Sequence, residues 1–306
     1  MQGTVFHTDN DVADLSGQVI IVTGGNAGLG FETIRQLVKH NPAHIYLAAR
    51  SKAKADAAIA QLAMPLSGPS SISFLQLDLS SFASVKAAAE AFKRSESRLD
   101  ILINNAGIMM TPEGLTEEGY EIQFGTNVMG HALLTQLLIP IIKETVKINP
   151  EARVVNLSSA SERMAPNDIY QFDELKTTMS SRNTTMRYCL SKIANIHYTS
   201  ALSEHHREIK IISVHPGMVA TNLHHNSTGF FLRPFLYIAI AFATPVEKGA
   251  LSQVWAAVSP DAKTGEFYSP VGISGKGSKR SRSRELQEQL WQWIQKELQG
   301  HLPNEM

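Results

Sequence analysis

In the second half of the chain, two residues have the types and the spacing needed for proton transfer. Tyr188 and Lys192 stand four apart in the run 187–206, whose apolar residues recur at helical intervals. Residues four apart lie on the same face of a helix, and an ammonium group beside a phenol favours the phenolate. We therefore expect Lys192 to lower the pKa of Tyr188 from its usual value of about 10. A tyrosine tuned in this way can act as a general acid or base at neutral pH. Because such pairs are common on helices, this interpretation needs support from the rest of the chain.

A glycine-rich segment near the N-terminus has the composition of a phosphate-binding loop. Residues 23–30 read TGGNAGLG and lie between a β-branched run at 18–23 and an apolar helical pattern at 31–40. Glycines allow a tight turn and a close approach of the backbone to a pyrophosphate, which the N-terminus of the next helix attracts. An ordinary strand-to-helix turn can also hold glycine, but this position in the chain favours dinucleotide binding. The cofactor contacts predicted here are Gly24, Asn26, Gly28, Leu29 and Gly30.

The residues after the second predicted strand indicate which dinucleotide binds. A carboxylate at that point would bind the ribose 2′-OH and favour NAD. Here Ala49 is followed by Arg50, with Lys52 and Lys54 close behind. An arginine can hold a 2′-phosphate through two hydrogen bonds. We therefore predict NADP(H) as the cofactor, with Arg50 and Lys54 among its contacts; the alternative interpretation is a solvated basic start of a helix.

Strands alternate with helices along the chain. The predicted strands are the apolar or β-branched runs at 18–23, 44–49, 72–77, 99–104, 153–158, 209–215 and 266–268. The predicted helices lie at 31–40, 51–63, 81–95, 115–148, 187–206, 245–258 and 285–299, with Pro140 marking a bend or a break. This alternation predicts an α/β fold with a parallel sheet of about seven strands and helices on both faces. We expect a polar lead-in at 1–16 and then one doubly wound, Rossmann-type domain over 17–300.

Composition excludes several classes of function. The formal net charge is zero, so no global field attracts the chain to nucleic acid, and we predict no nucleic-acid partner. Cys189 is the single cysteine, which excludes an internal disulfide and a cysteine-based metal cluster. The His205-His206 and His224-His225 pairs lack metal-ligand spacing, so no metal site is predicted. The polar first ten residues carry no secretory or transit signal, which together with the lone thiol favours a cytoplasmic location.

Further motifs follow the glycine loop in a recognisable order. They are Asp78-Leu79 after the third predicted strand, Asn104-Asn105-Ala106-Gly107 after the fourth, Asn127, Ser158-Ser159 after the fifth, and PGMVAT at 216–221. Together with TGxxxGxG and the YxxxK pair, they make residues 17–270 resemble the short-chain dehydrogenase/reductase family. The resemblance implies the same fold and a nicotinamide cofactor.

The resemblance also implies a role for each catalytic candidate. Tyr188 would donate a proton in reduction and accept one in oxidation, while Lys192 would lower its pKa and hold the nicotinamide ribose. A serine hydroxyl would orient the substrate oxygen, and the family usually uses the second of two serines, which is Ser159 rather than Ser158. Asn127 would hold a water for proton relay; the alternative is a buried asparagine satisfied by backbone.

More cofactor contacts follow from the same resemblance. Asp78 would meet the adenine, and the PGMVAT segment would lie at the nicotinamide end. The contacts implied beyond the glycine loop are Asp78, Leu79, Asn105, Ala106, Gly107, Tyr188, Lys192, Pro216, Gly217, Val219 and Thr221.

Three features resemble the branch of retinol dehydrogenases and WW-domain oxidoreductases, to which many fungal biosynthetic reductases are similar. They are the long gap from Ser159 to Tyr188, the His215-Pro216-Gly217 turn and the sequence YCLSK at 188–192. The implied function is hydride transfer between NADP(H) and a carbonyl or alcohol group of a lipophilic small molecule. Two alternatives are a catalytically silent NADP-sensing protein and a dehydratase or epimerase that uses the same pair.

The C-terminal third provides the expectations about substrate and partners. Residues 218–244 match the position of the family's substrate lid, and their apolar part, 229–243, is too short and interrupted to span a bilayer. We expect an apolar substrate wall there, with contact to a membrane surface as the rival interpretation. Trp291 and Trp293 in the last helix could face the body of the protein or another subunit. Relatives commonly pair through the helices after strands four and five, so a homodimer is an open prediction.

Overall fold

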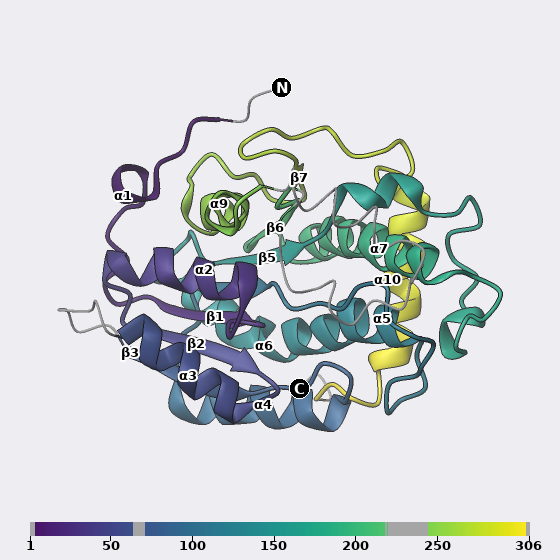
Figure 1. Ribbon diagram of the computed structural model, residues 1–306, viewed down its shortest axis with the longest axis horizontal. Coiled ribbons are helices and arrows are strands. Elements are labelled where there is room, and N and C mark those ends of the chain that lie inside the picture. The colour runs from purple at the N-terminus through teal and green to yellow at the C-terminus, as the bar shows by residue number, and fades with distance from the viewer. Residues whose placement is uncertain (1–3, 64–70, 218, 220–243, 304–306) are drawn as a thin grey trace.

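Seven parallel strands form one sheet in the computed structural model, which describes residues 4–63, 71–217, 219 and 244–303 (Figure 1). The strands are β1 (Val19–Thr23), β2 (His44–Ala49), β3 (Ser71–Gln76), β4 (Ile101–Asn104), β5 (Arg153–Leu157), β6 (Lys210–Val214) and β7 (Phe267–Tyr268). Their order across the sheet is β3-β2-β1-β4-β5-β6-β7, and every neighbouring pair is parallel. The order reverses between β1 and β4, and in sheets of this kind ligands bind beyond the carboxyl ends of the strands at such a reversal.

The central strands are buried along their whole length, as their sequences predict. β1 reads VIIVT, β4 ILIN and β5 RVVNL, and each of these residues is buried. A strand covered on both faces has no polar face, so it reads as a continuous apolar run without alternation. Polar residues appear at the carboxyl ends, where Thr23, Asn104 and Asn156 approach the site described below.

Helices cover both faces of the sheet. One face carries α2 (Gly28–Leu37), α3 (Lys52–Ala63) and α9 (Val246–Val258) over one apolar core. The other carries α4 (Phe82–Ser95), α6 (Gly130–Val146), α7 (Thr184–His205) and α10 (Arg284–Leu298) over a second core. Short elements complete the described chain: α1 (Thr8–Asp11), α5 (Ile122–Phe124), a π-helical turn at Gly125–Met129, and 3₁₀ turns at Val38–His40, Ala160–Met164 and Glu174–Lys176. The predicted doubly wound α/β fold is confirmed.

The helix predicted over 115–148 differs from the structure in two ways. It runs over 122–146, and Pro140 does not break it, because α6 continues from Gly130 to Val146. Pro140 is exposed, so water can reach the carbonyl that loses its partner when the proline lacks an N–H. The irregularity lies instead in the π turn at Gly125–Met129, which contains Asn127.

The same helix is the one described segment long and apolar enough to cross a membrane by length and composition. An 18-residue window within Ile122–Val146 has a mean hydropathy of 1.3, but 83% of that window is buried inside the fold. α6 packs against α4 and the sheet core. The core position therefore accounts for its apolar composition.

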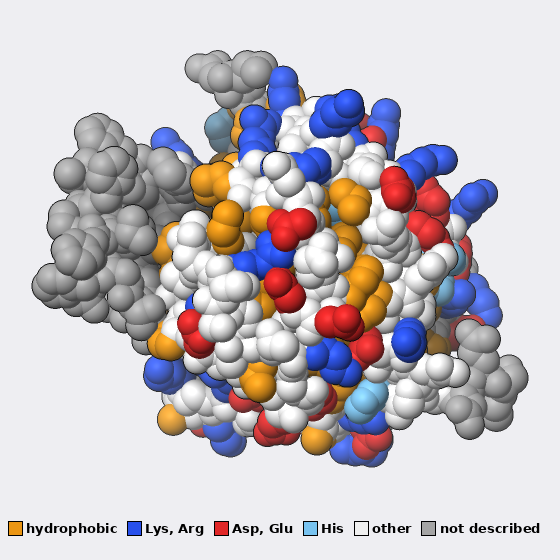
Figure 2. Space-filling model, turned by 90° about the vertical axis from the view of Figure 1, so that its right-hand side faces the viewer, with side chains coloured by type: hydrophobic (Ala, Val, Ile, Leu, Met, Phe, Trp, Pro, Cys, Tyr) orange, Lys and Arg blue, Asp and Glu red, His pale blue; other side chains and the backbone are white. Residues whose placement is uncertain are grey.

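The last helix packs on the body of the protein. Trp291 is buried and stacks on His205, and Trp293 stacks on Phe172 and meets Tyr120 edge-on. α10 thus covers part of α7, one of the two helices expected to pair in a dimer. On the face turned to the viewer in Figure 2, hydrophobic side chains are interspersed with charged ones. Trp291 and Trp293 therefore both pack against residues of the same chain.

Candidate active site

The glycine loop connects β1 to the first turn of α2 in the backbone conformation that glycine permits. Gly24 and Gly28 have φ angles of 67° and 54°, in the left-handed region. A Cβ at Gly30 would overlap the Gly24 carbonyl and lie 2.6 Å from the Asn105 amide nitrogen. The third glycine is therefore required so that α2 can start directly behind the loop. Among the described residues, no side chain caps the N-terminus of α2, which leaves its backbone N–H groups available to an anion.

Buried hydrogen bonds fix the neighbouring loop after β4. The Asn105 amide donates to the Thr23 carbonyl (2.7 Å), and the Ala106 N–H donates to the Thr23 hydroxyl (2.9 Å). Thr23 is bonded in turn to His131 Nε2 at 2.9 Å, and His131 Nδ1 lies 3.1 Å from the Asn127 carbonyl. Burial lowers the pKa of His131 to about 4, so the ring is neutral at pH 7. These bonds join the carboxyl ends of β1 and β4 to the π turn.

A cavity of about 580 Å³ lies at these carboxyl ends, at the reversal point of the sheet. It is lined by most of the predicted cofactor contacts: Gly24, Asn26, Gly28, Leu29, Arg50, Asp78, Leu79, Asn105, Ala106, Gly107, Tyr188, Lys192 and Pro216. The glycine loop after β1, the carboxyl ends of β2, β3, β4, β5 and β6, and α7 thus contribute to one continuous site. Its size falls within the range of small-molecule and cofactor pockets.

The polar groups expected at the adenosine end have different surroundings. The Asp78 carboxylate is held by the backbone N–H of Ser80 (2.9 Å) and by the Ser80 hydroxyl (2.7 Å). Arg50 is exposed at the cavity edge and makes no ion pair with any residue that the structure describes. Lys54 is also exposed but does not line the cavity. Arg50 is therefore the better placed of the two predicted cations.

Tyr188 and Lys192 project from one face of α7 into the cavity, as their spacing predicts. The Lys192 ammonium lies 5.6 Å from the centre of the Tyr188 ring and donates to the Leu157 carbonyl at 3.1 Å. Lys192 is almost fully buried, and burial lowers its pKa to about 8.

The expected lowering of the Tyr188 pKa is wrong for the protein groups alone. Burial raises this pKa to about 12, and the hydrogen bond with the Ser159 hydroxyl only partly opposes the rise. Burial penalises the phenolate. At neutral pH Tyr188 is therefore a phenol, which is the form that donates a proton.

The two serines after β5 have different partners. The Ser158 hydroxyl is buried and donates to the Lys192 carbonyl at 2.6 Å, which ties β5 to α7. The Ser159 hydroxyl interacts with Tyr188 and accepts the Ser161 N–H at 3.1 Å. Ser159 thus interacts with the phenol, whereas Ser158, and not Ser159, lines the cavity.

Asn127 lies behind the cavity wall. Its side-chain oxygen accepts the Ile108 N–H (2.8 Å), and its amide donates to the Ile108 carbonyl (2.9 Å) and to the Ser191 hydroxyl (3.0 Å). A Cβ at Gly107 would lie 3.2 Å from the Asn127 oxygen and 3.6 Å from the Lys192 nitrogen. The side chain is thus satisfied largely by backbone, which was the alternative expectation, yet it borders the space beside Lys192.

Several predicted contacts do not line the cavity. Gly30 supports the loop from behind, Gly217 takes a left-handed turn with φ 86°, and Val219 pairs with Thr244 in an isolated parallel bridge. Of the lid segment 218–244, only Val219 and Thr244 belong to the described residues, and Thr221 lies outside them.

Four buried residues that support the site were absent from the predictions: Thr23, His131, Gln123 and Arg187. Each acts through hydrogen bonds between segments far apart in the sequence, so no local spacing indicates these roles, although Thr23 opens the glycine motif. A polar residue inside an apolar helical pattern, such as His131, is the one sequence signal that could have drawn attention.

Comparisons with known proteins agree with this geometry. The family model described as short chain dehydrogenase matches residues 18–170. A short-chain dehydrogenase/reductase of Armillaria gallica is 38% identical over 291 residues, covering 94% of this chain and 92% of that protein. Human retinol dehydrogenase 12 is 33% identical over 281 residues, covering 90% and 85%. Among solved structures, an uncharacterized protein of Mycobacterium paratuberculosis aligns with a TM-score of 0.76 and 26% identity, covering 98% and 100%.

The matched residues contain the glycine loop and the strands that carry it, and the relatives extend the likeness over nearly the whole chain. The predicted resemblance is thereby confirmed. The chain belongs to the short-chain dehydrogenase/reductase family of nicotinamide-dependent oxidoreductases.

Proposed function

We propose that this protein is an NADP(H)-dependent oxidoreductase that interconverts a carbonyl and an alcohol group on a lipophilic small molecule. The observation that carries the proposal is that Tyr188 and Lys192 line the same cavity as the glycine loop, with the Ser159 hydroxyl interacting with Tyr188. Proton transfer and dinucleotide binding are thereby served by one continuous site.

The cavity suits a dinucleotide in shape and charge. Its backbone approaches closely at Gly24, where a Cβ would lie 3.1 Å from Ala106 and from the Asn105 amide. The α2 N-terminus would hold the pyrophosphate, Asp78 the adenine end and Lys192 the nicotinamide ribose. When bound, the nicotinamide supplies or takes up the hydride.

The residues of the chain then manage the proton and the charge on the substrate oxygen. In reduction, the Tyr188 phenol donates its proton to that oxygen as the hydride reaches the carbonyl carbon. The Ser159 hydroxyl donates a hydrogen bond to the same oxygen and stabilises the developing negative charge. The Lys192 ammonium, charged below pH of about 8, stabilises the phenolate that remains.

Arg50 supports NADP(H) over NAD(H). It lies at the cavity edge after β2, where NAD-binding relatives of this fold carry an acidic residue, and its guanidinium has no partner within the described chain. A 2′-phosphate would supply two negative oxygens for it.

The apolar lining near Tyr188 supports a lipophilic substrate. Ile108, Met109 and Ile122 line the cavity that Tyr188 also lines. Human retinol dehydrogenase 12, which is 33% identical, carries in its name a lipophilic alcohol. A cytoplasmic location, contact with a membrane surface and a homodimer stay predictions.

NADPH oxidation over a panel of aromatic, polycyclic and long-chain carbonyls tests the proposal. We expect turnover with at least one of them, and we expect Tyr188→Phe to reduce kcat by a factor of about 10²–10⁴ while NADPH binding is kept. Turnover unchanged by Tyr188→Phe would contradict the mechanism. NADPH binding without turnover of any carbonyl would favour the silent binding protein.

A further inference from the structure

One wall of the cavity is a short irregular segment after β4, residues 108–111. Ile108, Met109 and Thr111 line the cavity. Met110 has a φ angle of 52°, in the left-handed region that costs free energy for a residue with a Cβ. Such a conformation persists only where the surroundings impose it. The contacts of this segment show what imposes it.

Gln123 of α5 holds the middle of the segment. Its side-chain oxygen accepts the Met110 N–H at 2.8 Å, at the strained residue itself. Its amide donates to the carbonyl and to the hydroxyl of Thr184, at 3.1 and 3.3 Å, in the first turn of α7. Gln123 is fully buried and does not line the cavity. One side chain therefore connects the wall to the helix that carries Tyr188.

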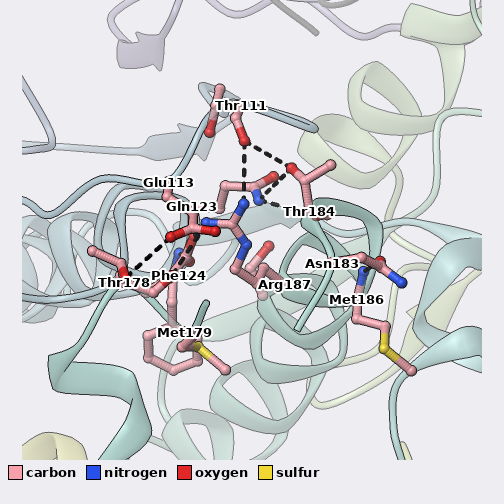
Figure 3. Close-up of polar contacts among 12 residues, drawn as sticks. Thr111, Glu113, Gln123, Phe124, Thr178, Met179, Asn183, Thr184, Met186 and Arg187 are labelled. Carbon is pink, nitrogen blue, oxygen red and sulfur yellow. Dashed lines mark hydrogen bonds and ion pairs between the residues drawn. The ribbon is translucent and has the colours of Figure 1, made fainter. Parts of the chain in front are cut away.

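The outer end of the segment is held at the Thr111 carbonyl, as Figure 3 shows. This oxygen accepts the Thr184 hydroxyl (2.8 Å) and the Arg187 guanidinium (3.4 Å). Arg187 directly precedes Tyr188, is almost fully buried, and pairs with Glu121 at 3.3 Å. Glu121 is fully buried and caps α5 by accepting the Phe124 N–H at 2.7 Å.

The inner end is held by Asn127, whose side chain bonds both the N–H and the carbonyl of Ile108. The wall is thus tied at Ile108 and Met110 to the α5–π turn and at the Thr111 carbonyl to the start of α7. None of Gln123, Glu121 and Arg187 lines the cavity. These three residues therefore act on a bound substrate only by fixing the position of the 108–111 wall.

We propose that Gln123, Thr184 and the buried Arg187–Glu121 pair are positioning residues that fix the 108–111 wall relative to Tyr188 and thereby set which substrate bodies fit beside the phenol. This inference rests on the proposed function. Substrates that fill the cavity touch the wall and depend on its position, whereas a compact carbonyl reaches Tyr188 without it. A misplacement of about 1 Å can cost about a hundredfold in rate.

The test compares Gln123→Met with Gln36→Met. Gln36 is also buried and makes two side-chain hydrogen bonds, to Glu32 (2.6 Å) and to the Glu247 carbonyl (3.1 Å), but it lies in α2 away from the wall. The measurements are kcat and KM for one compact and one bulky carbonyl from the panel, with the Kd of NADPH from fluorescence titration. The ratio of the two kcat/KM values is the decisive quantity, because partial unfolding lowers both by the same factor.

We expect Gln123→Met to lower kcat/KM for the bulky carbonyl by about 10- to 100-fold and to lower the bulky-to-compact ratio by about fivefold or more, with the Kd of NADPH unchanged within about twofold. Gln36→Met should leave the ratio at its wild-type value. An unchanged ratio in Gln123→Met, whatever its total activity, overturns the inference. Wild-type protein that reduces no carbonyl overturns the proposed function instead, which is a separate result.

Thr184 provides milder variants should Gln123→Met fail to fold. Thr184→Val removes the hydroxyl that bonds the Thr111 carbonyl, while Thr184→Ser keeps it. We expect the ratio to fall in Thr184→Val, by about two- to fivefold, since the hydroxyl's hydrogen bond to the Thr111 carbonyl and its weaker one from the Gln123 amide are lost. The ratio should return to the wild-type value in Thr184→Ser. Equal ratios in these two variants contradict the inference.

Discussion

The Lys192 ammonium lies almost fully buried beneath the cavity, and replacing it with Met separates its role in turnover from its cost to the fold. Burial lowers its pKa from 10.5 to about 8. A difference of this kind means that the charged form is less stable in the folded protein than in the unfolded chain. At neutral pH Lys192 is charged, so its burial lowers the stability of the folded protein.

The magnitude follows from the pKa difference. Each pKa unit corresponds to about 1.4 kcal/mol, so the shift corresponds to roughly 3 kcal/mol at pH 7. Met loses the hydrogen bond to the Leu157 carbonyl, worth about 1 kcal/mol. That carbonyl keeps its bond from Asn195 at 3.0 Å, so no buried acceptor is left without a partner. We expect Lys192→Met to be about 2 kcal/mol more stable than wild type, or about 3 °C higher in Tm for a chain of this length.

The dependence on pH provides the sharper assay. Between pH of about 8 and 10.5 the unfolded wild-type chain binds more protons at Lys192 than the folded one does, so wild-type stability gains from rising pH. The methionine of the Lys192→Met variant has no titrating proton at this position. The stability difference between variant and wild type should therefore be full below pH 8 and decrease through this window, while other titrating groups cancel in the comparison.

Thermal unfolding of both proteins at pH 7 and pH 9.5, with NADPH oxidation measured alongside, completes the test. We expect the variant to be more stable at pH 7, less so at pH 9.5, and without measurable turnover. A variant less stable than wild type at pH 7, or a difference that does not change with pH, would refute the reasoning that burial of the charge costs free energy here.

Three other substitutions test separate parts of the site. Arg50→Asp should weaken NADPH binding about 10- to 100-fold and leave NADH binding equal or stronger, measured by fluorescence titration; equal loss for both cofactors would argue against a 2′-phosphate contact. Gly30→Ala should lower stability by about 1–3 kcal/mol and weaken cofactor binding, because its Cβ overlaps the Gly24 carbonyl; a wild-type Tm and Kd would mean that the loop shifts freely. Ser159→Ala should lower kcat about 10²- to 10³-fold and Ser158→Ala much less, and the reverse order would exchange their roles.

The strands and the order of elements could be predicted because a strand buried on both faces has a continuous run of apolar residues in the sequence. The run VIIVT of β1 and the run ILI of β4 are apolar without alternation, and a glycine directly follows β1. The break expected at Pro140 could not be judged in this way. Whether a helix tolerates proline depends on whether water reaches the freed carbonyl, which is a property of the packed fold.

The residues of the candidate site likewise differ in whether the sequence alone predicts them. Gly24 and Tyr188 could be predicted to line the cavity because each belongs to a motif of fixed local spacing, and Asp78 because the resemblance to the family implies it. Gln123 and Arg187 could not, since their partners, Met110 and Glu121, take meaning only once α5, α7 and the 108–111 segment are folded together. Residues that position a wall are recognised by contacts between distant segments, and these leave no periodic pattern.

The pKa of Tyr188 shows most clearly what spacing omits. The i, i+4 relation places Lys192 beside the phenol, and proximity alone predicts a lowered pKa. Burial acts on both groups in opposite directions, raising the pKa of Tyr188 to about 12 and lowering that of Lys192 to about 8. The ammonium lies 5.6 Å from the ring centre, and desolvation is the largest cause of the shift, so at neutral pH the protein's own groups hold Tyr188 as a proton donor beside a charged lysine. For Tyr188 to accept a proton in the oxidative direction, additional positive charge must come close to the phenol, and the protein groups around the cavity do not provide it within the part of the chain that the structure describes.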